Sequence, residues 1–199
     1  MRPTLFISDL HLCEERPEVS ELFFRFMETQ VPGSDVLYIF GDLFEVWVGD
    51  DQLDHAPLAR RVATALRDAS LQGTAVHFMH GNRDFLVGPR FADAAGLKLL
   101  PDPSVIELGG ERVLLMHGDT LCTAGLAYQA FRRQARDPAW QASLLAQSYA
   151  EREALARSIR SRSDTEKSMK PDAIMDVNPA AVVDAFVRND CLAMVHGHT

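Results

Sequence analysis

Five short apolar runs recur along the chain, and helical patterns separate the first three. The runs cover residues 5–8, 36–40, 75–79, 113–116 and 192–195, and each has the length and the Val, Ile, Leu and Phe content of a buried strand. Residues 18–30 and 57–71 place apolar side chains at helical spacing. Strands that alternate with helices pair in parallel through right-handed crossovers. The sequence therefore predicts an α/β fold.

Two further signals refine this fold. Residues 104–116 contain Gly109-Gly110 between apolar stretches, which predicts an antiparallel hairpin and therefore mixed strand pairing. Asn178 followed by Pro179 is typical of a helix start, where asparagine accepts from the first free backbone N–H groups. The sequence contains no run of about 18 uncharged apolar residues, so no transmembrane span is expected. We expect one domain over residues 1–199.

Each apolar run is followed by side chains that can bind a metal ion. In chain order these side chains are Asp9 and His11, then Asp42, then Asn82, then His117, and finally His196 and His198. Ligands of open α/β sheets gather beyond the carboxyl ends of the strands, so we expect the seven residues to share one site. A mixture of oxygen and nitrogen donors suits Mn, Fe or Zn better than Ca.

Seven ligands are too many for one ion and suit two ions that share a carboxylate. Asp42 is the expected bridge, because it is the one ligand on its strand. The first ion is assigned Asp9, His11, Asp42 and His198, and the second Asp42, Asn82, His117 and His196. Each motif alone has an ordinary structural alternative, such as a turn cap at Asp9, but their order along the chain favours the metal site.

The ordered motifs D-x-H, G-D, G-N-R-D, H and H-x-H resemble the signature of the calcineurin-like metallophosphoesterases. Longer segments are similar to a narrower family, the UDP-2,3-diacylglucosamine diphosphatases of lipid A biosynthesis: GDLFEVWVGDD (41–51), HGNRDFLVG (80–88), LMHGDTLCT (115–123), YQAFR (128–132) and AIMDVN (173–178). The resemblance covers residues 4–199. It implies the calcineurin-like fold, with mixed β-sheets layered with helices and a helical lid insertion at about 124–171.

The resemblance also implies a reaction, which is hydrolysis of the pyrophosphate bond of UDP-2,3-diacylglucosamine to UMP and 2,3-diacylglucosamine 1-phosphate. Two divalent ions, usually Mn²⁺, would activate the attacking water. The implied enzyme is cytoplasmic and peripherally attached to the inner membrane, so its partners are the lipid-linked UDP-sugar and the membrane surface. No nucleic acid and no obligate protein partner are expected.

Catalytic roles fall, by the same resemblance, on Asp42, Asn82, Arg83 and His117. Many relatives have histidine where this chain has Arg83. Arginine does not give up its proton in proteins, and a leaving phosphate, whose second pKa is about 6, needs no acid. We therefore expect Arg83 to stabilise charge on the phosphates, with a salt bridge to Asp84 as the alternative. Asp84 and Asp119 are candidates for orienting Arg83 and His117.

Substrate contacts implied by the resemblance are Asn82, Arg83, Tyr128, Ser163, Lys167, Lys170 and His196. Two positions depart from the family pattern: Lys167 replaces a frequent asparagine, and Ala124-Gly125-Leu126 replaces acidic residues. The insertion is expected to bind the acyl chains, although packing of Tyr128 within the helices is an alternative to substrate contact. Relatives continue after H-x-H, so we expect C-terminal strands to be missing beyond Thr199.

The charge distribution bears on the competing functions. The net charge is −8, yet residues 128–170 contain nine Lys or Arg and five Asp or Glu, so an acidic body carries one basic segment. A metal-dependent phosphodiesterase or nuclease of the same superfamily remains the alternative function. A nuclease would favour histidine at Arg83 or a basic groove on the body. A non-catalytic scaffold would typically have lost metal ligands, and all seven are present.

Overall fold

Helices separate the strands from residue 4 to residue 100, which confirms the predicted α/β class. The computed structural model describes residues 2–167 and 176–198, and for residues 161–167 it describes the backbone alone. The elements are β1 (Thr4–Ile7), α1 (Pro17–Thr29), β2 (Val36–Ile39), α2 (Gln52–His55), α3 (Pro57–Leu71), β3 (Ala75–Met79), α4 (Pro89–Ala95), β4 (Leu97–Leu100), β5 (Ser104–Leu108), β6 (Glu111–Met116), α5 (Leu126–Ala135), α6 (Pro138–Leu145), α7 (Tyr149–Lys167), α8 (Pro179–Asn189) and β7 (Ala193–His196).

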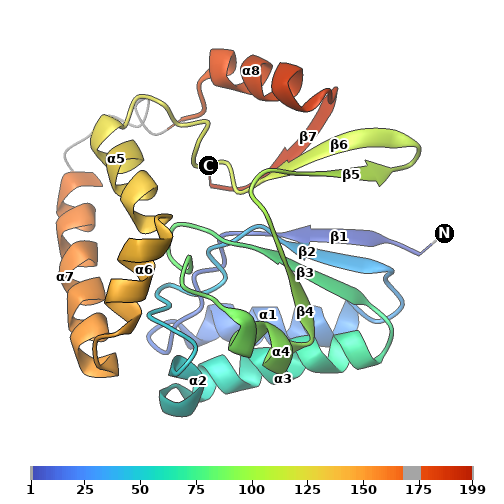
Figure 1. Cartoon of the computed structure of the whole chain (residues 1–199). Coiled ribbons are helices and arrows are strands. Elements are labelled where there is room, and N and C mark those ends of the chain that lie inside the picture. Colours follow the sequence, from blue (N-terminus) through green and yellow to red (C-terminus); the bar gives the residue numbers. More distant parts are fainter. Residues whose placement is uncertain (1, 168–175, 199) are drawn as a thin grey trace.

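The first sheet is parallel and has the strand order β1-β2-β3-β4. Its register pairs Thr4 with Val36 and Val36 with Ala75. The strands are parallel because α1, α3 and α4 return the chain to the same end of the sheet after each strand. Their carboxyl ends therefore lie along one edge, and Figure 1 shows this edge facing α5, α6 and α7.

The second sheet has the order β5-β6-β7 and contains the predicted hairpin. β5 and β6 are antiparallel and turn at Gly109 and Gly110, which have φ of 63° and 88°. β7 pairs with β6 in parallel, so that Met116 lies beside His196. Mixed pairing is thus found in this sheet, whereas the first sheet is wholly parallel.

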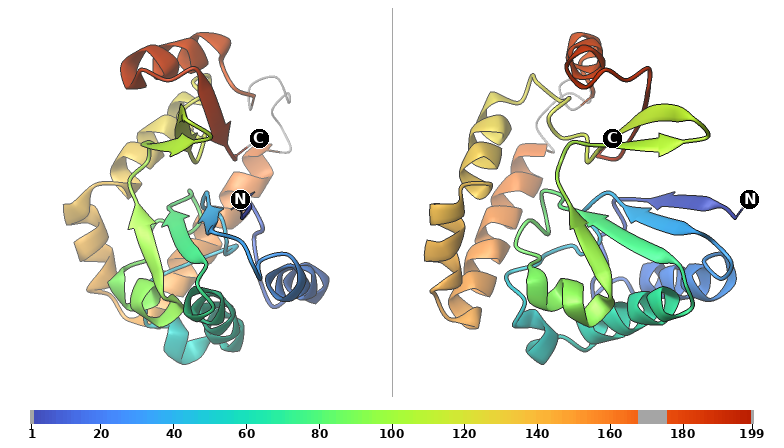
Figure 2. Two further views of the ribbon diagram at one scale, coloured as in Figure 1. Left: turned by 90° about the vertical axis from the view of Figure 1, so that its right-hand side faces the viewer. Right: turned by 45° about the vertical axis from the view of Figure 1, so that its right-hand side comes forward.

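The two sheets lie face to face between helices. α1 and α3 cover the outer face of the first sheet and α8 covers the outer face of the second, which gives the layers helix, sheet, sheet and helix (Figure 1; two further views in Figure 2). Several helices begin with proline, whose fixed φ suits the first helical position. At α8 the predicted cap is confirmed, because the Asn178 side chain accepts from the backbone N–H of Ala180 at 2.9 Å.

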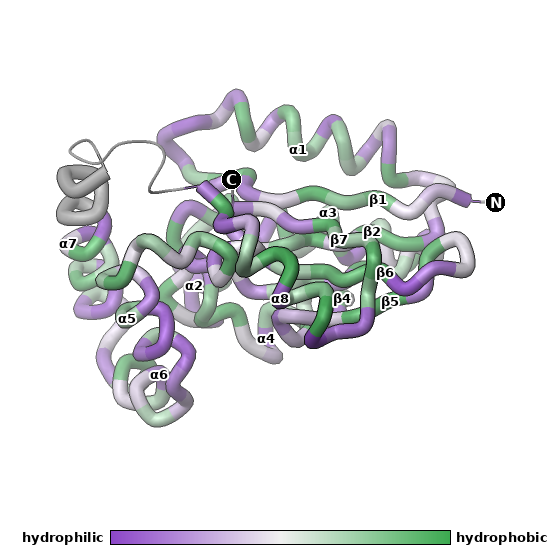
Figure 3. The backbone as a smooth tube through the Cα atoms, turned by 90° about the horizontal axis from the view of Figure 1, so that it is seen from above, coloured by the Kyte–Doolittle hydropathy of each residue, from purple (hydrophilic) through white to green (hydrophobic). Residues whose placement is uncertain are grey.

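Three hydrophobic clusters fill the spaces between these layers. The largest packs the first sheet against α1, α3 and α4 and includes Leu37, Leu66 and Phe91. The second lies between the sheets and includes Phe40 and Leu115. The third packs β6 and β7 against α8. Figure 3 shows the matching pattern on α1, where hydrophobic and hydrophilic segments alternate from turn to turn.

The expected insertion contains, in its described part, α5, α6 and α7. α5 ends at Ala135, shortly before Asp137-Pro138, and Asp137 caps α6 by accepting from the backbone N–H of Trp140 at 2.8 Å. Within the ranges 2–167 and 176–198, no helix is both long enough and apolar enough to cross a membrane.

Candidate metal centre

The loops that follow β1 and β2 remain paired beyond the strands themselves. The backbone N–H of Asp9 donates to Gly41 O at 3.1 Å, and that of His11 donates to Asp42 O at 2.8 Å. These bonds extend the parallel ladder into the two loops, so the first two predicted ligand motifs lie side by side. These main-chain bonds therefore hold the Asp9 and Asp42 motifs next to each other.

The loop after β3 lies against the same segment through two glycines. A Cβ on Gly41, whose φ is 78°, would overlap with the backbone of Gly81, and a Cβ on Gly81 would overlap with Asp42. Asp84, which is fully buried, accepts from the backbone N–H groups of Asp42 and Gly81. Glycine at both positions permits the contact, and the Asp84 carboxylate bonds the two loops together.

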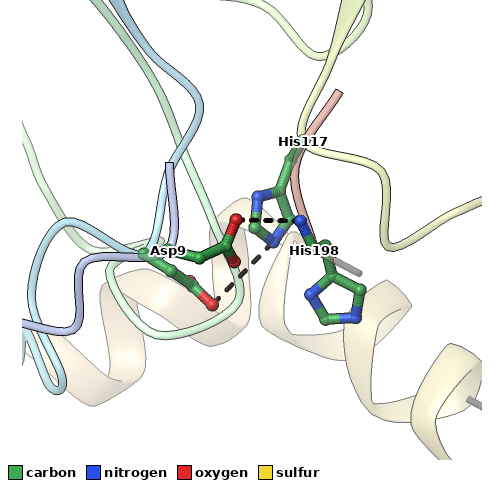
Figure 4. A group of neighbouring side chains, drawn as sticks. Asp9, His117 and His198 are labelled. Atoms are coloured by element: carbon green, nitrogen blue, oxygen red, sulfur yellow. Dashed lines mark hydrogen bonds and ion pairs between the residues drawn. The ribbon is translucent and has the colours of Figure 1, made fainter. Parts of the chain in front are cut away.

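The second sheet supplies the histidines from the opposite side. The backbone N–H of Gly197 donates to His117 O at 2.9 Å, which joins the loops after β6 and β7. The backbone N–H of His198 donates to Asp9 Oδ2 at 2.9 Å, so the H-x-H loop is bonded directly to the first sheet. Figure 4 shows Asp9 on one side of the site and His117 and His198 on the other.

Four of the predicted ligands form one compact group. Asp9, Asp42, His117 and His198 each offer a ligand atom, and these atoms all lie within 4.8 Å of one another. Asp42 and His117 are buried, whereas Asp9 and His198 are partly exposed. Two carboxylates and two imidazoles suit a transition metal ion such as Mn²⁺. One side of the group is thus closed by protein and the other is open to solvent.

His11 and Asn82 flank this group. His11 Nε2 lies 3.9 Å from Asp42 Oδ2, and His117 Nε2 lies 4.0 Å from the same oxygen. Asn82 Oδ1 lies 3.3 Å from His117 Nε2. Asp42 Oδ2 therefore lies between one imidazole from the first sheet and one from the second.

The backbone at these residues is strained. Of the five non-glycine residues with positive φ that the structure describes, four are predicted ligands: Asp9 at 55°, His11 at 50°, Asp42 at 51° and His198 at 58°. Each left-handed residue costs about 1 to 3 kcal/mol and persists only where the surrounding structure imposes it. Strain of this kind concentrates at functional sites, and here it coincides with the ligand motifs.

The protonation of Asp42 is shifted by its surroundings. Burial, together with the neighbouring Asp84 carboxylate, raises the pKa of Asp42 to about 7. Interactions with His117 and with the Arg83 backbone N–H lower this pKa but do not outweigh the two raising effects. Burial lowers the pKa of His11 below its usual value. A buried carboxylate and a neutral imidazole are both suited to bind a cation, because the cation supplies the positive charge that the site lacks. The residues present therefore fit divalent metal ions.

Of the remaining predicted site residues, three are described with their side chains. The backbone N–H of Arg83 donates to Asp42 Oδ1 at 2.8 Å. His196 Nδ1 lies 2.9 Å from the neighbouring Gly197 O. The Tyr128 hydroxyl donates to Asp119 at 2.8 Å, and its ring stacks on His198 with centroids 5.7 Å apart. Lys170 and the side chains of Ser163 and Lys167 lie outside the described part of the chain.

Two expectations about supporting residues are wrong. Asp119 does not orient His117 through its ring; instead His117 Nδ1 donates to Phe40 O at 2.6 Å, while Asp119 accepts from Arg132 Nε at 2.7 Å. Asp84 does not pair with Arg83, because its carboxylate is used by backbone N–H groups. The Arg83 guanidinium lies 3.8 Å from Glu45 instead. A backbone carbonyl has no sequence signal, and the position of Glu45 follows only from the folded loop.

The helices of the insertion contact the site loops through arginine side chains. Arg132 also bonds to Asp102 at 2.9 Å. Arg136 donates to the carbonyl oxygens of His80 and Gly81 at 3.0 and 2.9 Å. Arg152, which is buried, donates to Val48 O at 2.7 Å and pairs with Asp51. α5 and α7 are therefore bonded to the loops that follow β2, β3 and β6.

Comparison with known proteins agrees with this geometry. The chain matches the calcineurin-like phosphoesterases over residues 2–199. It is 52% identical over 203 residues to the UDP-2,3-diacylglucosamine hydrolase of Xanthomonas axonopodis pv. citri, which covers 98% of this chain and 81% of that protein. The protein of the same name from Stenotrophomonas maltophilia is 50% identical over the same length, with the same coverage. The chain belongs to the calcineurin-like phosphoesterase family.

Proposed function

We propose that the chain hydrolyses the pyrophosphate bond of UDP-2,3-diacylglucosamine to UMP and 2,3-diacylglucosamine 1-phosphate, as a step of lipid A biosynthesis. The observation that carries this proposal is the identity of 52% to a UDP-2,3-diacylglucosamine hydrolase, extending over 98% of the chain. Such a match includes both the ligand loops and the helical insertion. The compact group of Asp9, Asp42, His117 and His198 supplies the corresponding chemistry.

The metal centre of this proposal contains two divalent ions, with Mn²⁺ as the preferred metal. Asp9, His11, Asp42 and His198 would bind the first ion, and Asp42, Asn82, His117 and His196 the second. When bound, such ions lower the pKa of a water molecule and neutralise the charge of phosphate oxygens. The short spacing around Asp42 Oδ2 supports Asp42 as the shared ligand.

In the reaction, a water oxygen bonds to one phosphorus and the bridging P–O bond breaks, so its electron pair leaves with the other phosphate. The Arg83 guanidinium stabilises the negative charge that accumulates on the phosphates. The leaving phosphate requires no proton from the protein. Asn82, whose Oδ1 lies 3.3 Å from His117 Nε2, would contact both an ion and a substrate oxygen, and its neutral amide would be the weakest of the ligands.

The insertion, about 124–171, is proposed to bind the lipid part of the substrate. Tyr128, Ser163, Lys167, Lys170 and His196 would contact the glucosamine and phosphate groups. The hydroxyl of Tyr128 donates to Asp119, so its contact with substrate would use the ring, which stacks on His198. The enzyme would act in the cytoplasm, attached peripherally to the inner membrane, because its substrate and one of its two products carry acyl chains.

A comparison of three substrates tests this proposal. Protein loaded with Mn²⁺ is incubated in parallel with UDP-2,3-diacylglucosamine, UDP-glucose and bis(p-nitrophenyl) phosphate, and UMP or nitrophenol is measured. The expected result is preferential release of UMP from the diacylated substrate, with little from UDP-glucose. A clear preference for the nitrophenyl diester would support a phosphodiesterase or nuclease instead. Release from UDP-glucose at the same rate would refute recognition of the acyl chains.

A further inference from the structure

Glu45 is a buried carboxylate surrounded by positive groups from three separate segments. Its Oε2 accepts from Arg16 at 2.6 Å, and its Oε1 lies 3.8 Å from Arg83 and 3.3 Å from Arg160. Arg16 directly precedes α1, Arg83 follows β3, and Arg160 belongs to α7. The three arginines, termed here the guanidinium cluster, thus bring the insertion and two site loops together around one side chain.

The guanidinium cluster lies directly beside the metal centre. Glu45 Oε2 is 3.9 Å from His11 Nδ1, and the opposite nitrogen of the same ring is 3.9 Å from Asp42 Oδ2. Arg16 also donates to His11 O at 2.6 Å. One imidazole ring therefore separates Glu45 from the predicted bridging carboxylate. An anion bound at the metal centre would lie within the field of the cluster.

The three guanidinium groups lie close together around one carboxylate. Like charges at such distances repel unless an anion separates them, and Glu45 is such an anion. A cluster of guanidinium groups is also suited to phosphate, which arginine binds through paired, charge-assisted hydrogen bonds.

The Arg83 side chain has a buried donor that could bind a phosphate oxygen. Its Nε atom is buried and has no hydrogen-bond partner among the described residues. Its distance of 3.8 Å from Glu45 is too long for a hydrogen bond, so Glu45 attracts the guanidinium without using its donors. A buried donor without a partner is costly, and a phosphate oxygen would satisfy it. Glu45 thereby positions the Arg83 guanidinium while leaving its donors available to a phosphate oxygen.

We propose that Glu45 is a positioning residue that orients Arg83 and Arg160 as a joint binding site for the substrate's pyrophosphate oxygens, and so couples α7 to the metal centre. The inference rests on the proposed function, because it assigns the phosphate-binding step of that reaction. Glu45 itself contacts no substrate, since its two oxygens are occupied by arginines. It acts through the direction in which the guanidinium groups point.

A double-mutant cycle between Glu45 and Arg83 tests this role. Glu45→Gln preserves the shape of the side chain and removes its charge. We expect kcat/KM for UDP-2,3-diacylglucosamine to fall about 10- to 100-fold, the usual range for residues that orient groups at a metal site. For Arg83→Ala, we expect kcat/KM to fall by at least the same factor. The loss of kcat/KM in the double variant should be smaller than the product of the two single losses, because part of the effect of Glu45→Gln acts through Arg83.

Two further measurements separate positioning from structural support. The Mn²⁺ content of Glu45→Gln, measured by elemental analysis, should equal that of the wild type. Glu21→Gln is the matched control, because Glu21 forms an exposed pair with Arg61 at 3.5 Å on the far side of the first sheet, and it should leave kcat/KM unchanged. Glu45→Asp retains the charge on a shorter side chain. Its kcat/KM should lie between that of the wild type and that of Glu45→Gln.

The outcomes distinguish the two proposals. Additive losses in the cycle, or a loss of Mn²⁺ in Glu45→Gln, would overturn the positioning role while wild-type turnover still upholds the proposed function. If Glu45→Gln does not fold, the same cycle with Glu45→Asp decides the question. Absence of wild-type turnover on this substrate would instead overturn the proposed function, and the cycle would then be measured with the nitrophenyl diester.

Discussion

His117 Nδ1 lies 2.6 Å from the carbonyl oxygen of Phe40, so a ring from the second sheet is bonded to the end of a strand of the first. A carbonyl oxygen only accepts, and Nδ1 must therefore carry the proton. The opposite nitrogen, Nε2, keeps its lone pair and lies 4.0 Å from Asp42 Oδ2. One hydrogen bond thus joins the sheets and prepares the imidazole to bind a cation.

Replacement of His117 by Gln should remove both of these functions. We expect the Mn²⁺ content to fall and hydrolysis to decrease by roughly 100-fold or more, because a proposed ligand and its orienting bond are lost together. His55→Ala is the control, since His55 stacks on Tyr149 with centroids 4.2 Å apart and lies outside the metal centre. Elemental analysis of both variants checks the prediction. Unchanged metal content in His117→Gln would contradict it.

Metal binding should depend on pH through Asp42. Because burial and Asp84 raise its pKa to about 7, a metal ion that binds below pH 7 must displace a proton, and the apparent affinity should fall roughly tenfold per pH unit. Above pH 7 the carboxyl is already ionised and this dependence levels off. Burial lowers the pKa of His11, so that ring adds little competition near neutral pH.

Calorimetry of the metal-free protein with Mn²⁺, in two buffers of different ionisation enthalpy, measures the protons released. We expect about one proton per chain from Asp42 at pH 6 and almost none from it at pH 8. The variant Asp42→Asn has no proton to release at this position and should bind Mn²⁺ weakly at both pH values. Equal affinity of the wild type at pH 6 and pH 8 would show that Asp42 is not a ligand.

Much of the fold follows from local sequence. The helix predicted over 57–71 is found as α3, and the hairpin at Gly109-Gly110 and the cap at Asn178 are also found. The segment from α4 to β4 was not predicted. α4 has only seven residues, and its N-terminal N–H groups are satisfied by Asp50, which lies 38 to 41 residues earlier in the sequence. A cap supplied by a residue so distant in sequence cannot be predicted from the residues around the helix.

The candidate site likewise has a part that the sequence predicts and a part that it does not. Its ligand motifs could be found because each follows an apolar run, and strand ends of a parallel sheet meet at one edge. Their supporting contacts could not be found. Phe40 contributes a main-chain oxygen, and Glu45 gains its role from arginines that are distant in sequence, including Arg160 in α7. Such roles depend on the approach of separate segments, which spacing along the chain does not encode.

The close contact between Gly41 and Gly81 predicts a large difference between two alanine substitutions. Gly41 has φ of 78° and Gly33 has φ of 85°, so alanine is strained similarly at both, by about 1 to 2 kcal/mol. A Cβ at Gly33 meets open space, whereas a Cβ at Gly41 overlaps with the Gly81 backbone. Gly41→Ala should therefore lower the free energy of unfolding by a further ~3 kcal/mol.

Urea denaturation of both variants measures this difference, and because the strain is matched, it isolates the contact between the loops. We also expect Gly41→Ala, but not Gly33→Ala, to lose Mn²⁺, since Asp42 and Asn82 each adjoin one of the two touching glycines. Equal destabilisation by the two substitutions would mean that the loops can separate without cost.

The docking of α7 should depend on Arg152 far more than on Arg157, which pairs on the exposed surface of the same helix. Arg152 is 5% exposed and donates to Val48 O while pairing with Asp51. Arg152→Met keeps the apolar stem but leaves this carbonyl and carboxylate without their donor. Because Asp51 is partly exposed, we expect a loss of only about 2 kcal/mol in the free energy of unfolding.

Arg157→Met is the matched substitution, because Arg157 pairs with Glu153 at 3.0 Å on the exposed surface of α7. Arg157→Met should lower the free energy of unfolding by no more than about 0.5 kcal/mol. Hydrogen exchange provides the local measurement: in Arg152→Met, amides of α7 and of the loop containing Val48 should exchange faster than in the wild type, whereas Arg157→Met should leave them unchanged. If exchange accelerates equally in both variants, α7 is attached by its apolar contacts, and the buried guanidinium contributes nothing specific to its position over the site.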